Sequence, residues 1–282
     1  MMKVFVTGKN GQLGWDVCKA LSEAGIENIG VDIQDFDLTQ EADVKTAIEQ
    51  AAPDCVIHCA AYTAVEKAEQ EQELCMAVNA TGTRNVALAC KQINAKMIYI
   101  STDYVFPGTG QGYSEVDSPP APNNIYGISK LAGEQAVKEL LDKYFIVRTS
   151  WVFGKNGGNF VKKILSLGNE KPEINVVADQ IGSPTYSRDL SILLRDMALS
   201  EKYGVYHASN EGICSWYEFA MEIKMLANLP CHIFPVPSTA YPSAVIRPEN
   251  SRLSKLSLDE NGFSRLPAWQ DGLRRFLQEC LD

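Results

Sequence analysis

The chain has 282 residues, of which 45% are hydrophobic and 22% charged, the balance of a globular protein able to bury a substantial core. Its net charge of −9 disfavours nucleic acids and anionic membranes as partners, because both bind basic surfaces. No signal-peptide pattern opens the sequence and no apolar run approaches the roughly 20 residues that cross a bilayer, so we expect a cytoplasmic protein.

The first half of the chain alternates between strand and helix patterns. The spacing of its apolar residues predicts strands over 3–7, 28–33, 55–60, 96–101 and 144–149, and helices over 12–24, 40–52, 66–93 and 124–141. Strands separated by helices indicate an α/β fold of the Rossmann type, in which helices cover both faces of a doubly wound parallel sheet.

The pattern changes after residue 150. A glycine-rich stretch over 154–158 precedes a predicted helix near 159–168, an apolar run over 174–178 and proline-punctuated segments over 230–248. We predict a Rossmann domain over residues 1–150 and a smaller C-terminal lobe over 151–282, some of whose segments return to the first domain.

The eight cysteines and three histidines are scattered, without the closely spaced pairs typical of zinc sites. Cys55 and Cys59 lie in an apolar run, where reduced and buried thiols are expected. The sequence therefore predicts neither a disulfide framework nor a bound metal.

A glycine-rich turn lies between the first predicted strand and the first predicted helix. Gly8, Gly11 and Gly14 would let the backbone bend tightly and approach a pyrophosphate, whose charge rests on amides at the helix N-terminus. Asp32, at the end of the second strand, could accept hydrogen bonds from the adenosine ribose and favours NAD(H). Lys9 could instead reach a ribose 2′-phosphate and favour NADP(H), or be an exposed turn residue. The turn thus predicts a dinucleotide cofactor and leaves the choice between NAD(H) and NADP(H) open.

Tyr126 and Lys130 are four residues apart on a predicted helix, so their side chains share one face. A free phenol has a pKa of about 10, and a nearby ammonium lowers this pKa by stabilising phenolate, which suits a proton donor at neutral pH. Thr102 and Asp103 follow a predicted strand, at the sheet edge where such folds bind ligands. The Thr102 hydroxyl could hydrogen-bond a substrate carbonyl or cap the backbone.

Six motifs in this order resemble the extended short-chain dehydrogenase/reductase superfamily and, within it, the dTDP-4-dehydrorhamnose reductase family. They are GKNGQLG at 8–14, AAYTAVEKAE at 60–69, STDYVF at 101–106, YGISK at 126–130, RTSWVF at 148–153 and RPENSRL at 247–253. The resemblance implies reduction of dTDP-6-deoxy-L-lyxo-4-hexulose, a dTDP-linked 4-keto-6-deoxy sugar, to dTDP-L-rhamnose by NADPH or NADH. Tyr126 would protonate the ketone oxygen while nicotinamide C4 delivers hydride, with Lys130 and Thr102 in support.

The resemblance also assigns binding roles. The cofactor would contact Gly8, Gly11, Gln12, Leu13, Gly14, Asp32, Asp37, Leu38, Ala61, Tyr62, Thr63, Tyr126 and Lys130. The sugar would contact Thr102, Asp103 and Trp151, and the nucleotide diphosphate would contact Asn159, Arg247, Asn250 and Ser251. Structural alternatives stand beside three of these roles: Trp151 could be a core side chain, Arg247 a surface residue, and Asp37 or Thr39 the cap of the next helix.

Two positions depart from the family pattern. His58 stands where these proteins often carry asparagine, and a neutral imidazole can still make a local hydrogen bond. Some relatives pair through acidic residues and a divalent metal, but Arg188 occupies what resembles one ligand position, although Asp16 is acidic. Arg188 counts against the metal-linked pairing, and both a monomer and a homodimer stay open.

Two other functions are alternatives. An epimerase or dehydratase would keep its NAD, but dehydratases resemble a Thr-Asp-Glu pattern, and Tyr104 here replaces its glutamate. A non-catalytic dinucleotide-binding subunit would tolerate loss of the catalytic pair, whereas Tyr126, Lys130 and Thr102 are all present. Both features favour a catalytic reductase.

Overall fold

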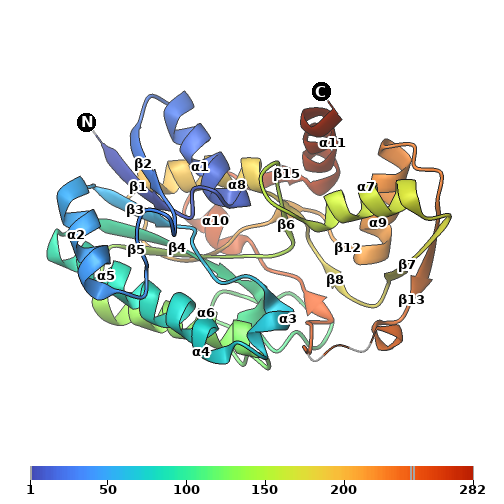
Figure 1. Ribbon diagram of the computed structural model, residues 1–282, viewed down its shortest axis with the longest axis horizontal. Coiled ribbons are helices and arrows are strands. Elements are labelled where there is room, and N and C mark those ends of the chain that lie inside the picture. The colour runs from blue at the N-terminus through green and yellow to red at the C-terminus, as the bar shows by residue number, and fades with distance from the viewer. Residues whose placement is uncertain (1, 242, 244, 282) are drawn as a thin grey trace.

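A computed structural model describes residues 2–241, 243 and 245–281 of the chain (Figure 1). Within them, parallel strands form a six-stranded central sheet in the order β10-β5-β4-β3-β1-β2. These strands are β1 (Lys3–Thr7), β2 (Glu27–Val31), β3 (Cys55–His58), β4 (Lys96–Thr102), β5 (Tyr144–Thr149) and β10 (Gly204–His207). The predicted α/β fold with a Rossmann-type parallel sheet is confirmed.

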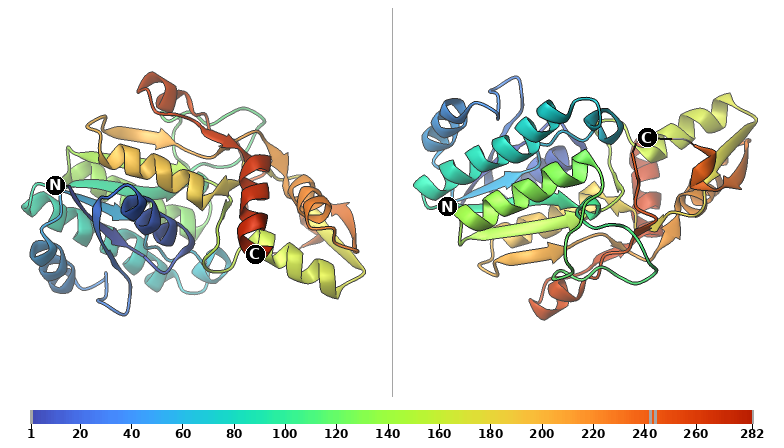
Figure 2. Two further views of the ribbon diagram at one scale, coloured as in Figure 1. Left: turned by 90° about the horizontal axis from the view of Figure 1, so that it is seen from above. Right: turned by 90° about the horizontal axis from the view of Figure 1, so that it is seen from below.

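Helices cover both faces of this sheet (Figure 2). One face carries α1 (Gln12–Glu23) and α8 (Ser187–Ala198), and the other carries α2 (Glu41–Ala51), α5 (Thr83–Gln92) and α6 (Ile125–Leu140). Side chains of the strands alternate between these two layers, so Val4 and Val6 belong to the first core and Phe5 to the second. Strands buried on both faces read as continuous apolar runs, which is why the sequence predicted them well.

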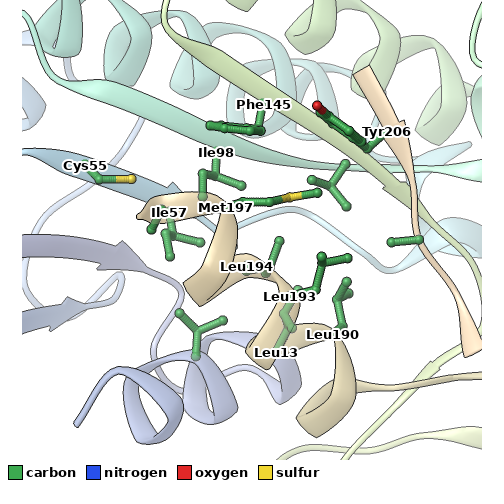
Figure 3. Close-up of a cluster of buried hydrophobic side chains, with 14 of the residues drawn as sticks. Leu13, Cys55, Ile57, Ile98, Phe145, Leu190, Leu193, Leu194, Met197 and Tyr206 are labelled. Atoms are coloured by element: carbon green, nitrogen blue, oxygen red, sulfur yellow. The ribbon is translucent and has the colours of Figure 1, made fainter. Parts of the chain in front are cut away.

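The C-terminal half returns to the sheet through α8 and β10. Strand β10 pairs in parallel with β5. Leu190 and Leu194 of α8 pack with Ile57 and Ile98 of the sheet (Figure 3). Each such fully buried aliphatic side chain contributes roughly 1.5–3 kcal/mol. The division of the chain near residue 150 stays a prediction.

The single helix predicted over 66–93 is wrong. The chain instead forms α3 (Val65–Ala68), α4 (Gln72–Met76), a π-helical turn η1 (Ala77–Gly82) and then α5. In the π turn, the Asn79 side chain accepts from the Tyr62 backbone N–H at 2.8 Å and donates to the Tyr62 carbonyl at 3.0 Å. These contacts with a distant loop override the local helical pattern, and π turns of this kind often mark functional sites.

Aromatic side chains fill a third hydrophobic core, built from segments after residue 150. The Phe153 ring lies 5.6 Å from Phe219 and 5.4 Å from Phe276, measured between centroids. The remaining strands and helices of the second half of the chain are β6 (Val152–Phe153), α7 (Phe160–Glu170), β7 (Glu173–Val177), β8 (Ile181–Gly182), β9 (Thr185–Tyr186), β11 (Asn210–Glu211), β12 (Cys214–Ser215), α9 (Trp216–Leu226), β13 (His232–Val236), β14 (Asn250–Ser251), α10 (Leu256–Glu260), β15 (Leu266–Ala268) and α11 (Trp269–Leu281). Among the described residues, none of the helices combines the length and apolarity needed to cross a membrane.

Candidate active site

A cavity of about 740 Å³ lies at the carboxyl ends of the central strands. It gathers predicted site residues from distant segments: Gly8, Gly11, Gln12, Leu13, Gly14, Asp32, Asp37, Leu38, Ala61, Tyr62, Thr63, Thr102, Asp103, Tyr126, Lys130, Trp151 and Asn159. The described residues that line it do not include Arg247, Asn250 or Ser251. We call Thr102, Asp103, Tyr126 and Lys130 the deep end of the cavity, and Asp32 and Asp37 with the neighbouring Lys9 and Asp35 its open end.

The glycine turn is shaped by close backbone contacts. Gly8 has a φ of +73°, and a Cβ there would lie 2.8 Å from the backbone N of Ala60. A Cβ on Gly14 would lie 2.1 Å from the Gly8 carbonyl oxygen, so only glycine fits. Gly11 is the N-cap of α1 and supplies no side-chain cap. The first amides of α1 therefore remain available to an anionic ligand.

Asp32 and Lys9 both have protein partners at the open end. The Asp32 carboxylate accepts from the backbone N–H groups of Asn10 and Ile33, each at 2.9 Å. The Lys9 ammonium lies 2.9 Å from Asp35 and holds the pKa of that carboxyl below its ordinary value. Lys9 is thus a partly exposed turn residue with an anionic partner.

Asp37 accepts from the Thr39 backbone N–H at 2.8 Å. The N-cap of α2 is Gln40, so the alternative in which Asp37 or Thr39 caps this helix is wrong. The helix begins at Glu41, one residue later than predicted. The Asp37 side chain is used instead in a local turn, where it accepts from both the backbone N–H and the hydroxyl of Thr39.

His58 is fully buried at the end of β3. Its Nδ1 lies 2.7 Å from the Thr7 hydroxyl and its Nε2 3.1 Å from the Thr83 hydroxyl. Burial, followed by the charge of Lys130, lowers the pKa of His58 to about 3. The imidazole is therefore neutral and makes local hydrogen bonds, as the sequence suggested for this departure from the family.

The deep end owes its shape to the start of α6. The Asn124 side chain caps this helix by accepting from the Gly127 backbone N–H at 2.8 Å. A Cβ on Gly127 would lie 2.2 Å from the Tyr104 carbonyl oxygen, so a glycine is needed for the helix to approach the loop after β4. This approach sets the Tyr126 ring 5.6 Å from Tyr104, edge to face.

Burial is the main cause of the pKa shifts of Tyr126 and Lys130. It raises the pKa of Tyr126 above its ordinary value, and the nearby Asp103 adds to the rise. It lowers the pKa of Lys130 to about 7, against the opposing charge of Glu134. The expectation that Lys130 lowers the phenol pKa is wrong for this structure, because the cost of burying phenolate exceeds any such stabilisation. The ammonium lies over the Tyr99 ring, 4.2 Å from its centroid.

Behind this pair lies a buried ion pair that the sequence did not reveal. Glu134, one helical turn beyond Lys130, accepts from Arg148 Nε at 2.8 Å and Nη2 at 2.7 Å. The Ser101 hydroxyl donates to the same carboxylate at 2.6 Å. Apolar periodicity gives no hint of this pairing, although the glutamate on the inner face of a helix is an indirect signal.

Trp151 lines the cavity and packs against the third hydrophobic core. Its φ of +50° is unusual for a bulky residue, and such strain often accompanies function. One face of its indole is covered by Trp216, 3.7 Å between centroids and 14° from parallel. Trp151 is therefore a cavity residue rather than a wholly internal one, and Trp216, which no motif contains, supports it.

The remaining predicted ligands have other contacts. Asn159 caps α7 and donates to the Gln12 side chain at 3.0 Å, joining the two halves of the cavity wall. Arg247 pairs with Glu66 at 2.8 Å. Asn250 donates to the Gly112 carbonyl at 2.7 Å.

Asp16 and Arg188 also have protein partners. Ser187 donates to the buried Asp16 carboxylate at 2.5 Å, and Arg188 pairs with Glu23. In residues 2–241, 243 and 245–281, no group of three histidine, cysteine or acidic side chains is arranged as a metal site. The oligomeric state stays a prediction.

Comparison with known proteins identifies the family. Residues 2–281 match the family model described as RmlD substrate binding domain. The spore coat polysaccharide biosynthesis protein SpsK of Bacillus subtilis (strain 168) is 41% identical over 280 residues, covering 99% of this chain and 98% of that protein. The dTDP-4-dehydrorhamnose reductase of Escherichia coli (strain K12) is 38% identical over 294 residues, again covering 99% and 98%.

Solved structures agree. The crystal structure of dTDP-4-dehydrorhamnose reductase from Bacillus anthracis str. Ames, in complex with NADP, is similar with a TM-score of 0.96 and 46% sequence identity, covering 99% of this chain and 100% of that one. The resemblance drawn from the six motifs is thereby confirmed. The chain belongs to the dTDP-4-dehydrorhamnose reductase family.

Proposed function

We propose that this chain reduces dTDP-4-dehydro-L-rhamnose, which is dTDP-6-deoxy-L-lyxo-4-hexulose, to dTDP-L-rhamnose in the cytoplasm. NADPH is the proposed hydride donor and NADH a weaker one. The relative from Bacillus anthracis was solved with NADP, which supports this choice. The observation that carries the proposal is that Tyr126, Lys130 and Thr102 line the same cavity as the glycine turn.

The residues present fit a dinucleotide. A Cβ at Gly8 or Gly14 would fill the cradle of the turn, and the uncapped amides of α1 suit a pyrophosphate. When bound there, NADPH supplies the hydride. Trp151 and Asn159, from later in the chain, line the same cavity and are the residues proposed to meet the nucleotide sugar.

Residues of the chain itself supply and transfer the proton. Tyr126 donates its phenolic proton to the ketone oxygen, because it is the hydroxyl of the deep end with an adjacent ammonium on its helix. Lys130 has a pKa of about 7, so near neutral pH it can both carry charge beside the forming phenolate and give up a proton. Burial of both groups keeps bulk water away from the transfer.

The proposal is tested by supplying the dTDP-linked keto sugar with NADPH and with NADH in separate reactions. We expect oxidation of one reduced cofactor for each dTDP-L-rhamnose formed, identified by NMR of the sugar. Conversion of the sugar without net oxidation of cofactor would instead indicate an epimerase or dehydratase. Tight cofactor binding with no conversion of any kind would indicate a regulatory subunit.

A further inference from the structure

Ser251 has a contact that its predicted role as a phosphate ligand does not explain. It lies on β14, which pairs with β8, and both its side chain and that of Asp103 are buried. The Ser251 hydroxyl donates to Asp103 Oδ2 at 2.5 Å. A strand of the C-terminal lobe therefore holds a carboxylate at the end of β4, which belongs to the central sheet.

The other oxygen of the same carboxylate engages Thr102. The Thr102 hydroxyl donates to Asp103 Oδ1 at 3.0 Å, and its oxygen accepts from the Tyr104 backbone N–H at 3.3 Å. A hydroxyl has one proton, so a Thr102 that donates to Asp103 presents only lone pairs to the rest of the cavity. The orientation of the Thr102 hydroxyl thus depends on Asp103.

We propose that Ser251 is a positioning residue that fixes the Asp103 carboxylate, and that this carboxylate sets whether Thr102 acts as a donor or an acceptor beside Tyr126. While Asp103 is ionised, Thr102 is an acceptor toward the cavity. When Asp103 takes a proton it can donate to Thr102, which frees the threonine proton for an oxygen in the cavity. The inference rests on the proposed function, in which that oxygen is the one that Tyr126 protonates.

The surroundings of Asp103 place its titration near neutrality. Burial raises the pKa of Asp103 to about 6, and the hydrogen bonds from Ser251 and Thr102 oppose the rise. The titratable groups that face it are Tyr104, the next residue in the chain, and Tyr126 on α6. Arg247, paired with Glu66, lies beyond Tyr104. The hydrogen bond from Ser251 stabilises the ionised carboxylate more than the protonated acid, so we expect its loss to raise the pKa of Asp103 further.

The pKa of Asp103 can be measured directly. Protein with 13C-labelled aspartate carboxyls is titrated by NMR, and the Asp103 signal is assigned by its absence from Asp103→Asn. We expect Ser251→Ala to raise this pKa by on the order of one unit, because a hydrogen bond to a charged group is lost. Ser251→Thr keeps the hydroxyl and should keep the wild-type value. The same shift should appear in the pH profile of kcat/KM with NADPH and the keto sugar.

A matched control lies six residues further along the chain. Ser257 is buried, and its hydroxyl has no hydrogen-bond partner among the described residues, so Ser257→Ala should leave the Asp103 pKa unchanged. If Ser251→Ala does not fold, Ser251→Cys serves, since its thiol is a weak donor of similar size and should raise the pKa by a smaller amount.

The inference would be overturned if the pKa of Asp103 were the same in the wild type and in Ser251→Ala. So would a shift that Ser251→Thr does not restore. Because the NMR titration needs no turnover, it remains decisive even for a protein that fails to reduce the keto sugar, a result that would count against the proposed function only.

Discussion

At the deep end of the cavity the Lys130 side chain is almost fully enclosed, whereas at the open end Lys9 and Asp35 expose 36% and 41% of their side chains. Burial favours the uncharged forms of the groups at the deep end: it lowers the pKa of Lys130 and raises the pKa values of Asp103 and Tyr126. Water and salt screen the charges of the open end instead. Substitutions at the deep end should therefore change chemistry, and those at the open end should change cofactor preference slightly.

The largest effect is expected from Tyr126→Phe. Removal of the proposed proton donor should lower kcat by about 10²–10⁴-fold, the range for a lost general acid, while NADPH binding is kept. Steady-state kinetics and a fluorescence titration of NADPH measure the two quantities. Tyr113→Phe, at a tyrosine that is 53% exposed and outside the cavity lining, is the control and should behave as wild type. Equal kcat in Tyr126→Phe and wild type would remove the phenol from the mechanism.

The contrast between buried and exposed charge can be tested on α6 alone. Glu134→Gln leaves the enclosed Arg148 without its anion and should lower the free energy of unfolding by about 3–5 kcal/mol. Glu139→Gln removes the charge of a surface ion pair, in which Glu139 lies 3.8 Å from Arg84, and should lower the free energy of unfolding by less than about 1 kcal/mol. Urea unfolding at pH 7 compares them. Similar losses in the two variants would show that burial does not set the strength of these pairs.

His58 should make the protein sensitive to acid. Its pKa is about 3 when folded and 6.5 in its ordinary state, so between these values the unfolded chain takes up a proton that the folded protein refuses. The contribution of His58 to the free energy of unfolding is then fully present above pH 6.5. Below this pH it falls by roughly 1.4 kcal/mol per pH unit. His58→Asn should lose that part of the slope in urea unfolding from pH 7 to 5. Parallel slopes would show that His58 titrates normally.

The smallest effect is expected at the open end. Asp35→Asn releases the Lys9 ammonium, which should raise the preference for NADPH over NADH by up to about fivefold, since exposed charge contacts contribute about 0.2–1 kcal/mol. Lys9→Ala should lower the same preference. The ratio of kcat/KM for the two cofactors, measured at low and at moderate salt, reports the effect. A ratio that neither variant changes would mean that Lys9 does not reach the 2′-phosphate.

The sequence predicted the fold of the first half closely because its signals are local. The strands predicted over 3–7 and 144–149 match β1 and β5 residue for residue, and the other three predicted strands differ from β2, β3 and β4 by at most two residues at either end. The exception is the helix over 66–93, where contacts of Asn79 with Tyr62 bend the chain through a π turn. Such long-range hydrogen bonds leave no trace in apolar periodicity.

The candidate site likewise contains a part that the sequence predicts and a part that depends on long-range packing. Residues near the ends of central strands come together in one cavity, since the fold itself brings those ends to one edge. Arg247, Asn250 and Ser251 follow proline-rich loops, whose course depends on packing between the two halves of the chain. For the same reason the Trp216 contact with Trp151 could not be predicted, because it joins segments 65 residues apart.

The most direct test follows the hydride itself. NADPH carrying deuterium at the transferable position of nicotinamide C4 is incubated with the protein and the dTDP-linked keto sugar, and the product is analysed by NMR. We expect dTDP-L-rhamnose with deuterium at the sugar C4 and consumption of one NADPH for each sugar formed. Deuterium that stays on the cofactor, or a sugar converted without the label, would contradict it.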